Sequence, residues 1–181
     1  MEYSESDIIK RCKKRDRKAQ YVFYKHHFAY LMSICLRYTR NRDEALDVLN
    51  LSFAKIMLNL NDFDGERSLN AWMRSITVNT IVDAFRKRSL YTDHIELKEA
   101  VYEFAPSADT AIGSNLIEVV QIHLHTLNPT TRSVFNLYAI DGYKHREIAK
   151  MLGITEGTSA WHYSEARKAL QRFLTPELKL P

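Results

Sequence analysis

The sequence predicts an all-α protein: two small helical domains joined by a flexible linker, the second ending in a helix-turn-helix. Apolar residues recur at the spacing of a helix over most of the chain, and 5 glycines and 4 prolines are few for 181 residues. The net charge of +4 is unevenly distributed, since residues 1–90 carry +6, residues 91–113 carry −4 and residues 114–181 carry +2. Two basic blocks around an acidic connector favour two surfaces that face a polyanion.

The linker is the segment where the helical period stops. From Leu90 to about Thr110 no convincing period survives, apart from a short helical piece around residues 96–104, and Pro106 interrupts the segment. These limits predict a first domain at residues 1–89, an acidic linker at 90–110 and a second domain at 111–181.

Composition restricts the class of protein further. Cys12 and Cys35 both fall on apolar helical positions, which favours buried, reduced thiols over a disulfide. No N-terminal apolar run resembles a signal peptide, and no apolar stretch is long enough to span a bilayer. We therefore expect a cytoplasmic protein without a membrane segment of its own.

Four helices are expected in the first domain. Ser4 or Ser6 caps the first, and its many cations suit either phosphate contacts or a solvated helix end. The others are expected at about residues 16–38, 41–60 and 68–88.

The third helix has two different faces. The expected core face contains Leu46, Leu49, Phe53, Ile56 and Leu60. The other face carries Asp43, Glu44, Asp47, Asn50 and Leu51. A solvated acidic face accounts for the carboxylates but not for an exposed leucine, so we interpret this face as a docking surface for another protein.

A polar loop at residues 61–67 precedes the fourth helix, where Asn79 and Asp83 stand one turn apart near a basic end. Cations at a helix C-terminus suit the helix dipole, which is the simplest account of residues 86–88. Two hydrogen-bonding side chains beside such cations can also read base edges while the cations hold phosphates.

The second domain is expected to begin near Ala111, with a further helix start at Asn128 and Pro129. Residues 145–152 then predict a short helix, Gly153 a left-handed turn, and Thr155 the cap of a longer helix from Glu156. Its buried face is expected to hold Ser159, Tyr163, Ala166, Leu170 and Phe173, and its outer row Trp161, Glu165, Lys168 and Arg172. Two helices around such a turn can place the second in a major groove.

Over nearly all of its length the chain resembles sigma factors of the extracytoplasmic-function class, the smallest two-domain bacterial RNA polymerase initiation subunits. In the first half the resemblance rests on Asp43-Glu44-Ala45-Leu46-Asp47, Phe53, Leu69-Asn70-Ala71-Trp72, Ile76, Asn79, Asp83 and Arg86-Lys87-Arg88. In the second half it rests on residues 127–129, 132–135, 142–143, 147–149, 152–154, 156–158, 166–168 and Leu170.

The resemblance implies a non-enzymatic factor that binds core RNA polymerase, through the β′ clamp and the β subunit, and directs promoter recognition. It implies clamp contacts by Asp43, Glu44, Asp47 and Asn50, with Leu51 beside them, and it admits an anti-sigma factor as a further partner. It implies no cofactor and no metal. Promoter DNA would be contacted by Phe63, Arg67, Asn79, Asp83, Arg86, Lys87, Arg132, Lys144, Thr158, Ser159, Trp161, His162 and Lys168.

The chain departs from the family pattern in three respects. Asn50 and Leu51 stand where a Gln and a carboxylate are usual, which makes the clamp contact more apolar. The second helix of the helix-turn-helix has fewer cations than usual around Trp161, and a thymine methyl contact by Ala160 or Trp161 is one consequence. Glu165 replaces a usual Arg.

Two other classes of function compete with this interpretation. A stand-alone helix-turn-helix regulator needs only the second domain, and should carry a ligand pocket or a dimerisation helix. A nucleic-acid enzyme needs a metal or nucleophile cluster, but His123 and His125 point to different helix faces and the loop at 61–67 lacks the full ligand set of a calcium site.

Overall fold

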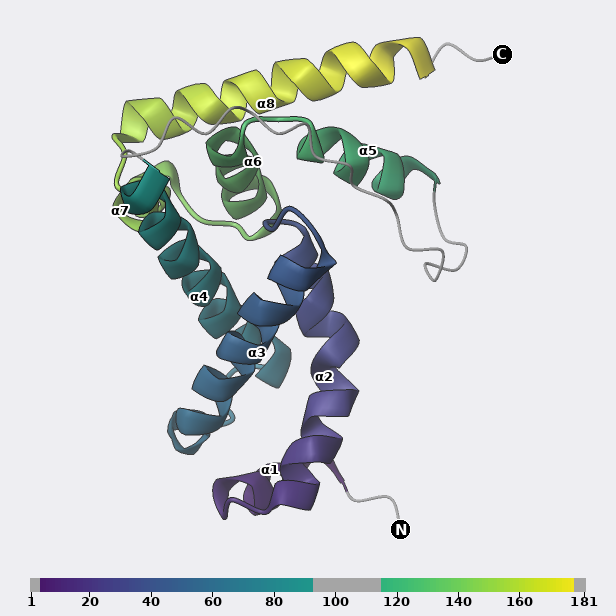
Figure 1. Cartoon of the computed structure of the whole chain (residues 1–181), viewed down its shortest axis with the longest axis vertical. Coiled ribbons are helices and arrows are strands. Elements are labelled where there is room, and N and C mark those ends of the chain that lie inside the picture. Colours follow the sequence, from purple (N-terminus) through teal and green to yellow (C-terminus); the bar gives the residue numbers. More distant parts are fainter. Residues whose placement is uncertain (1–3, 93–114, 178–181) are drawn as a thin grey trace. The chain divides into compact units, whose positions relative to one another are not determined.

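A computed structural model describes the backbone of residues 4–92 and 115–177, and the side chains of residues 4–87 and 120–174. The described backbone is helical, with turns between the helices, and the chain divides into two compact units, Met1–Lys87 and Arg88–Pro181 (Figure 1). Apart from residues 90–92, which belong to a helix, the predicted linker lies outside the described residues.

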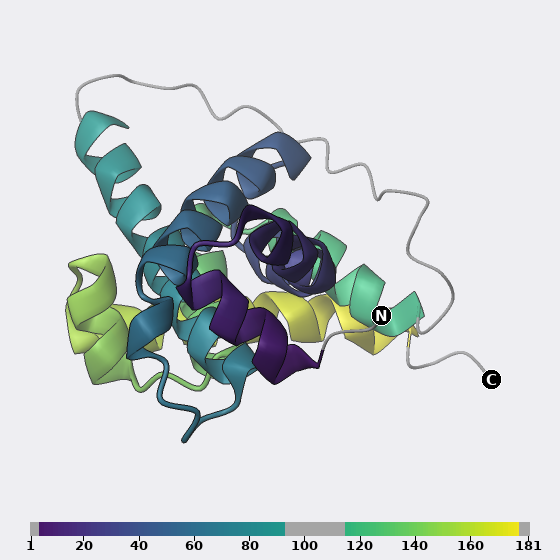
Figure 2. The ribbon, with the colours of Figure 1, turned by 90° about the horizontal axis from the view of Figure 1, so that it is seen from below.

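The first unit is built from four α-helices: α1 (Glu5–Lys13), α2 (Arg17–Leu36), α3 (Arg42–Leu58) and α4 (Leu69–Thr92). A short 3-10 helix, η1 (Leu60–Asp62), follows α3. Helix α1 lies across the N-terminal end of α2 and contacts η1 (Figure 2). Phe23, Leu31, Leu49, Ile56 and Met73 are fully buried in the core of this unit.

Side-chain caps fix where three of these helices begin. Ser4 caps α1, Asp16 caps α2 and Asn41 caps α3, each by accepting a hydrogen bond from a backbone N–H of the first turn. Asp16 also forms an ion pair with Arg11 at 2.6 Å, and that hydrogen bond lowers the pKa of the Asp16 carboxyl. The predicted helix starts are thus confirmed.

The predicted core face of α3 is wrong at one position. Leu46 is 37% exposed, whereas Ala45, Leu49, Ser52 and Ile56 are buried. The buried row recurs at spacings of four, three and four and packs toward α2, so Leu46, about 100° further round the helix, faces outward.

The second unit is built from α5 (Asn115–His125), α6 (Pro129–Phe135), η2 (Asn136–Ile140), α7 (His145–Leu152) and α8 (Glu156–Glu177). Helix α8 is the longest of them within this unit, and α5, α6 and α7 all pack against it (Figure 1). η2 is a π-helix that continues α6 directly, and such turns within helices are often found near functional sites.

The predicted helix-turn-helix is confirmed in its local geometry. Gly153 ends α7 with φ of 70°, in the left-handed region that favours glycine. Thr155 accepts a hydrogen bond from the Thr158 N–H at 3.0 Å and so caps α8. Ile148 and Leu152 of α7 and Ala166 and Leu170 of α8 are buried in the core of this unit.

Cys12 and Cys35 are free and buried, as predicted. Burial raises the pKa of the Cys12 thiol to about 11 and that of Cys35 to about 12, so both stay protonated near neutral pH. No helix in the part of the chain that the structure describes is long and apolar enough to cross a membrane.

Candidate protein and nucleic-acid interfaces

The outer face of α3 combines carboxylates with exposed leucines. Asp43, Asp47 and Asn50 are exposed, and Leu51 among them is 50% exposed. Leu46 adds a second apolar side chain to this face, which sequence periodicity alone had assigned to the core. We define the outer face of α3 as Asp43, Leu46, Asp47, Asn50 and Leu51; apolar side chains inside a charged rim are typical of a protein-binding surface.

Two members of the predicted clamp-binding set are also held within the unit. Glu44 is half-buried, donates its backbone N–H to Asn41 Oδ1 at 2.9 Å and accepts the Arg40 N–H at 3.1 Å, so its carboxylate helps to fix the start of α3. Asn50 Oδ1 accepts a hydrogen bond from the Tyr24 hydroxyl at 3.1 Å, which ties the outer face of α3 to α2.

The loop between α3 and α4 is anchored at its aromatic residue. Phe63 is half-buried against Trp72, with ring centroids 5.3 Å apart, and Lys13 donates to the Phe63 carbonyl at 3.1 Å. Gly65, with φ of 84°, provides the turn, while Arg67 is exposed. The loop is therefore anchored to its unit at Phe63, and the exposed Arg67 places a cation near its C-terminal end.

Helix α4 carries a polar stripe opposite its core residues. Asn79 and Asp83 are exposed one turn apart, and Arg86 and Lys87 follow on the same helix, also exposed. Asp83 forms an ion pair with Lys55 of α3 at 3.1 Å, which places a third cation beside this stripe. Lys55 was not in the predicted set, because nothing in the sequence spacing links α3 to α4 at this point.

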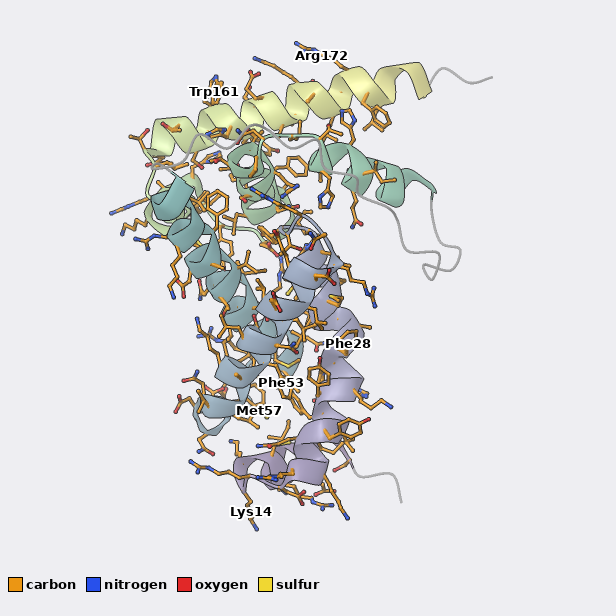
Figure 3. All side chains as sticks on the ribbon, viewed as in Figure 1. Lys14, Phe28, Phe53, Met57, Trp161 and Arg172 are labelled. Carbon is orange, nitrogen blue, oxygen red and sulfur yellow. The ribbon has the colours of Figure 1, made fainter. Side chains whose placement is uncertain are left out.

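The outer row of α8 faces away from its unit. Trp161 is 58% exposed and points to the side of α8 opposite α5 and α6, as does Arg172 (Figure 3). Lys168 donates to Glu165 Oε1 at 2.9 Å within the same row. Thr158 is half-buried, with its hydroxyl 2.8 Å from that of Thr155.

Lys144 precedes α7 and is exposed, in agreement with a role at the phosphate backbone that remains a prediction. Its backbone N–H donates to Glu147 Oε2 at 2.8 Å, which stabilises the first turn of α7. His162, by contrast, is half-buried, and its Nδ1 lies 2.9 Å from the Thr131 hydroxyl of α6. Burial lowers the pKa of His162, so this ring is neutral at pH 7 and joins α8 to α6.

Ser159 cannot contact DNA, which corrects the predicted set. Its side chain is 0% exposed, and its hydroxyl lies 3.0 Å from His145 Nδ1 across the helix-turn-helix. His145 in turn stacks on Tyr138, with ring centroids 4.2 Å apart. Ser159, His145 and Tyr138 therefore hold the two helices in their crossing geometry.

Arg132 is the second correction. It is 3% exposed, and its Nη1 lies 3.0 Å from His125 Nδ1 in the interior of the second unit. A guanidinium enclosed in this way cannot reach a phosphate on an approaching duplex. The predicted phosphate contact came from the family resemblance, and the sequence carries no signal of the partner at His125.

No group of three metal-binding side chains occurs among the described side chains, those of residues 4–87 and 120–174. His123 stacks on Phe173, with centroids 4.2 Å apart, and His125 pairs with Arg132, so both rings pack within the unit. What the exposed groups offer is charge, apolar surface and hydrogen-bonding side chains for binding macromolecules.

Comparison with known proteins gives consistent matches to both units. The model of sigma-70 region 2 matches residues 23–91, and that of sigma-70, region 4 matches residues 124–170. The ECF RNA polymerase sigma-E factor of Salmonella typhimurium is 27% identical, over 95% of each chain. The ECF RNA polymerase sigma factor SigW of Bacillus subtilis is 26% identical, over 92% of this chain and 94% of its own.

A solved structure has a similar fold. It contains the sigma factor RpoE in complex with the anti-sigma factor NepR from Bartonella quintana. Its similarity covers 84% of this chain and 96% of that chain, with 21% identity and a TM-score of 0.56.

Proposed function

Because the chain belongs to the sigma-70 family, as a sigma factor of the extracytoplasmic-function class that directs promoter recognition by core RNA polymerase, we propose that its two units divide this work. Residues 1–89 dock on the polymerase and trap melted bases of the minus-ten element. Residues 111–181 bind the duplex minus-thirty-five element, and residues 90–110 connect the two. The observation that carries the proposal is the presence, within the first unit, of two different exposed surfaces on neighbouring helices.

The first surface is the outer face of α3, which we propose binds the β′ clamp. Its leucines provide apolar area, and Asp43 and Asp47 provide charge for steering and register. Leu51 replaces the usual carboxylate. The affinity of this contact therefore depends more on buried apolar area, and less on salt concentration, than the affinity of an all-acidic face does.

The second surface is the stripe of Asn79 and Asp83 on α4, with Phe63 and Arg67 in the preceding loop. We propose that these side chains receive an unstacked base, while Arg86, Lys87 and Lys55 lie near phosphates. Unstacking a base costs a few kcal/mol, which pocket contacts must offset. Lys55 also neutralises Asp83 through their ion pair, and this reduces the repulsion between that carboxylate and the DNA backbone.

Separating the two surfaces by mutation tests this division. The pair Asp47→Ala and Leu51→Ala is expected to weaken binding of the labelled chain to core polymerase by about tenfold or more, since apolar anchors at an interface are each worth ~1–2 kcal/mol. The pair Asn79→Ala and Asp83→Ala should leave that affinity unchanged and reduce promoter melting, measured by permanganate reactivity. Glu5→Ala, which removes an exposed carboxylate on α1, is the matched control for both.

The proposal fails if the α3 variant binds core polymerase as tightly as the unaltered chain. It fails equally if the α4 variant melts a cognate promoter at the normal rate. Loss of both activities in both variants would indicate unfolding of the first unit, which circular dichroism detects.

A stand-alone regulator is not favoured, because the similarity extends over both units. A gel shift on duplex promoter DNA provides the direct comparison. A stand-alone regulator binds without polymerase, whereas the proposed factor should require it.

Three further assignments follow from the family and are part of the proposal. Catalysis belongs to the polymerase and not to this chain. The site of action is the cytoplasm, where the polymerase works. The solved relative contains an anti-sigma factor, and we propose that a partner of that kind also competes with core polymerase for this chain.

A further inference from the structure

Glu165 is an acidic residue on the outer side of α8, the helix that we propose binds duplex DNA, and 40% of its side chain is exposed. It shares one stripe with Trp161 and Lys168, at spacings of four and three residues, and the buried residues Ser159, Ala166 and Leu170 lie on the opposite side. Trp161 marks the outward direction of this stripe (Figure 3). The structure thus directs the Glu165 carboxylate away from the core of its unit.

From this geometry we propose that Glu165 reads a cytosine in the duplex promoter element, by accepting a hydrogen bond from the cytosine N4 amino group in the major groove. The inference rests on the proposed function, because it requires that α8 enters that groove.

The chemistry of a carboxylate makes this selection. An ionised carboxylate is an acceptor only, so it pairs with donors and is repelled by acceptors. In the major groove guanine presents two acceptors, thymine an acceptor and a methyl group, and adenine an acceptor beside its donor. Only cytosine presents a donor without an adjacent acceptor of its own.

Lys168 makes the position of this carboxylate compatible with nearby phosphates. Its ammonium donates to Glu165 Oε1 at 2.9 Å, which offsets the negative charge and limits the rotation of the side chain. The second oxygen, Oε2, has no hydrogen-bond partner among the described residues and remains available to a base.

Trp161 sets the register of α8 relative to the base pairs. It precedes Glu165 by four residues, or about 6 Å along the helix axis, compared with about 3.4 Å per base pair. A helix along the groove therefore places the indole against a thymine methyl about two base pairs from the cytosine that Glu165 reads. Both residues lie within the first three turns of α8, the part of a recognition helix that reaches base edges.

The test is run-off transcription with core polymerase and the full chain on a library randomised in the upstream duplex element. Sequencing the transcribed templates is expected to show cytosine enriched roughly five- to tenfold at one position, the low end for a base-edge contact. Glu165→Gln should replace that preference with adenine at the same position, because an amide matches the adjacent donor and acceptor of adenine. Glu165→Ala should remove the preference without creating a new one.

Arg172→Gln is the matched control, since it changes a charge on the same side of α8 two turns further along (Figure 3). It should lower transcription from all templates alike and leave the preferred bases unchanged. The inference is overturned if the unaltered chain enriches no cytosine in this element. It is also overturned if the Glu165→Gln chain selects the same bases as the unaltered chain. If no template is transcribed with any form of the chain, the proposed function itself fails.

Discussion

His27 is a buried histidine whose ring lies beside that of Phe23, with ring centroids 4.4 Å apart and the planes tilted by 53°. Burial, with a smaller contribution from the nearby charge of His26, lowers the pKa of His27 from 6.5 to about 4. The folded chain therefore binds fewer protons than the unfolded chain between these values, and its stability falls as pH decreases from about 6.5 to about 4. The full effect is at most about 3 kcal/mol.

Calorimetric unfolding between pH 7 and pH 4.5 measures this effect. We expect His27→Gln to lower stability at pH 7 and to flatten the dependence on pH in this range. His26→Gln, at the exposed neighbouring position, should leave most of the dependence in place. An unchanged pH dependence in His27→Gln would contradict the assignment.

Arg132 illustrates a different role from the one that sequence alone indicated. Because it is enclosed beside His125, Arg132→Met should reduce the stability of the second unit by about 2–4 kcal/mol, as loss of a buried hydrogen-bonded group does. Thermal unfolding is the measurement, with the exposed Arg167→Met as the matched control expected to change stability by less than about 0.5 kcal/mol. If the Arg132→Met variant has normal stability but binds DNA more weakly, the prediction that Arg132 contacts a DNA phosphate would hold after all.

Single residues show where prediction from sequence stops. Asn41, Gly153 and Thr155 were assigned correctly, because a cap or a left-handed turn depends on residues within one helical turn. Leu46 was misplaced, because its exposure depends on which face of α3 packs against α2. Ser159 was correctly placed on the buried face of its helix, but its partner His145 on α7 is not encoded in local spacing.

At the scale of one element, the turn between α7 and α8 depends on the left-handed conformation of Gly153. A Cβ at this position would meet no atom within 4 Å, so Gly153→Ala introduces backbone strain without a clash. We expect a loss of about 1 kcal/mol, seen as a lower unfolding temperature.

Gly157 provides the control for that change within the same helix-turn-helix. It lies in the first turn of α8, where its nearest neighbour to an added Cβ is Thr155 Oγ1 at 3.9 Å. Gly157→Ala should therefore leave stability unchanged or raise it by up to about 1 kcal/mol. Equal losses in the two variants would show that the conformation of Gly153 is not the cause.

Among the elements, the helices themselves were well predicted from periodicity and capping, and α7 begins and ends where expected. The surfaces were predicted less completely. Leu46 on the outer face of α3 and Lys55 beside the stripe on α4 were missing from the predicted surfaces. Their positions depend on contacts between helices, which the sequence does not show.

At the scale of the whole molecule, we propose two exposed binding surfaces in one unit and a recognition helix in the other. Among the side chains that the structure describes, those of residues 4–87 and 120–174, no group of three could hold a metal ion. We propose that the chain recruits polymerase, opens the promoter and selects the promoter sequence.

The most direct test of that account is transcription by purified core polymerase from a promoter library, with and without the full chain. The account predicts transcripts from a defined subset of templates only when the chain is present, and none from those templates with core polymerase alone. The same set of transcripts with and without the chain would contradict it.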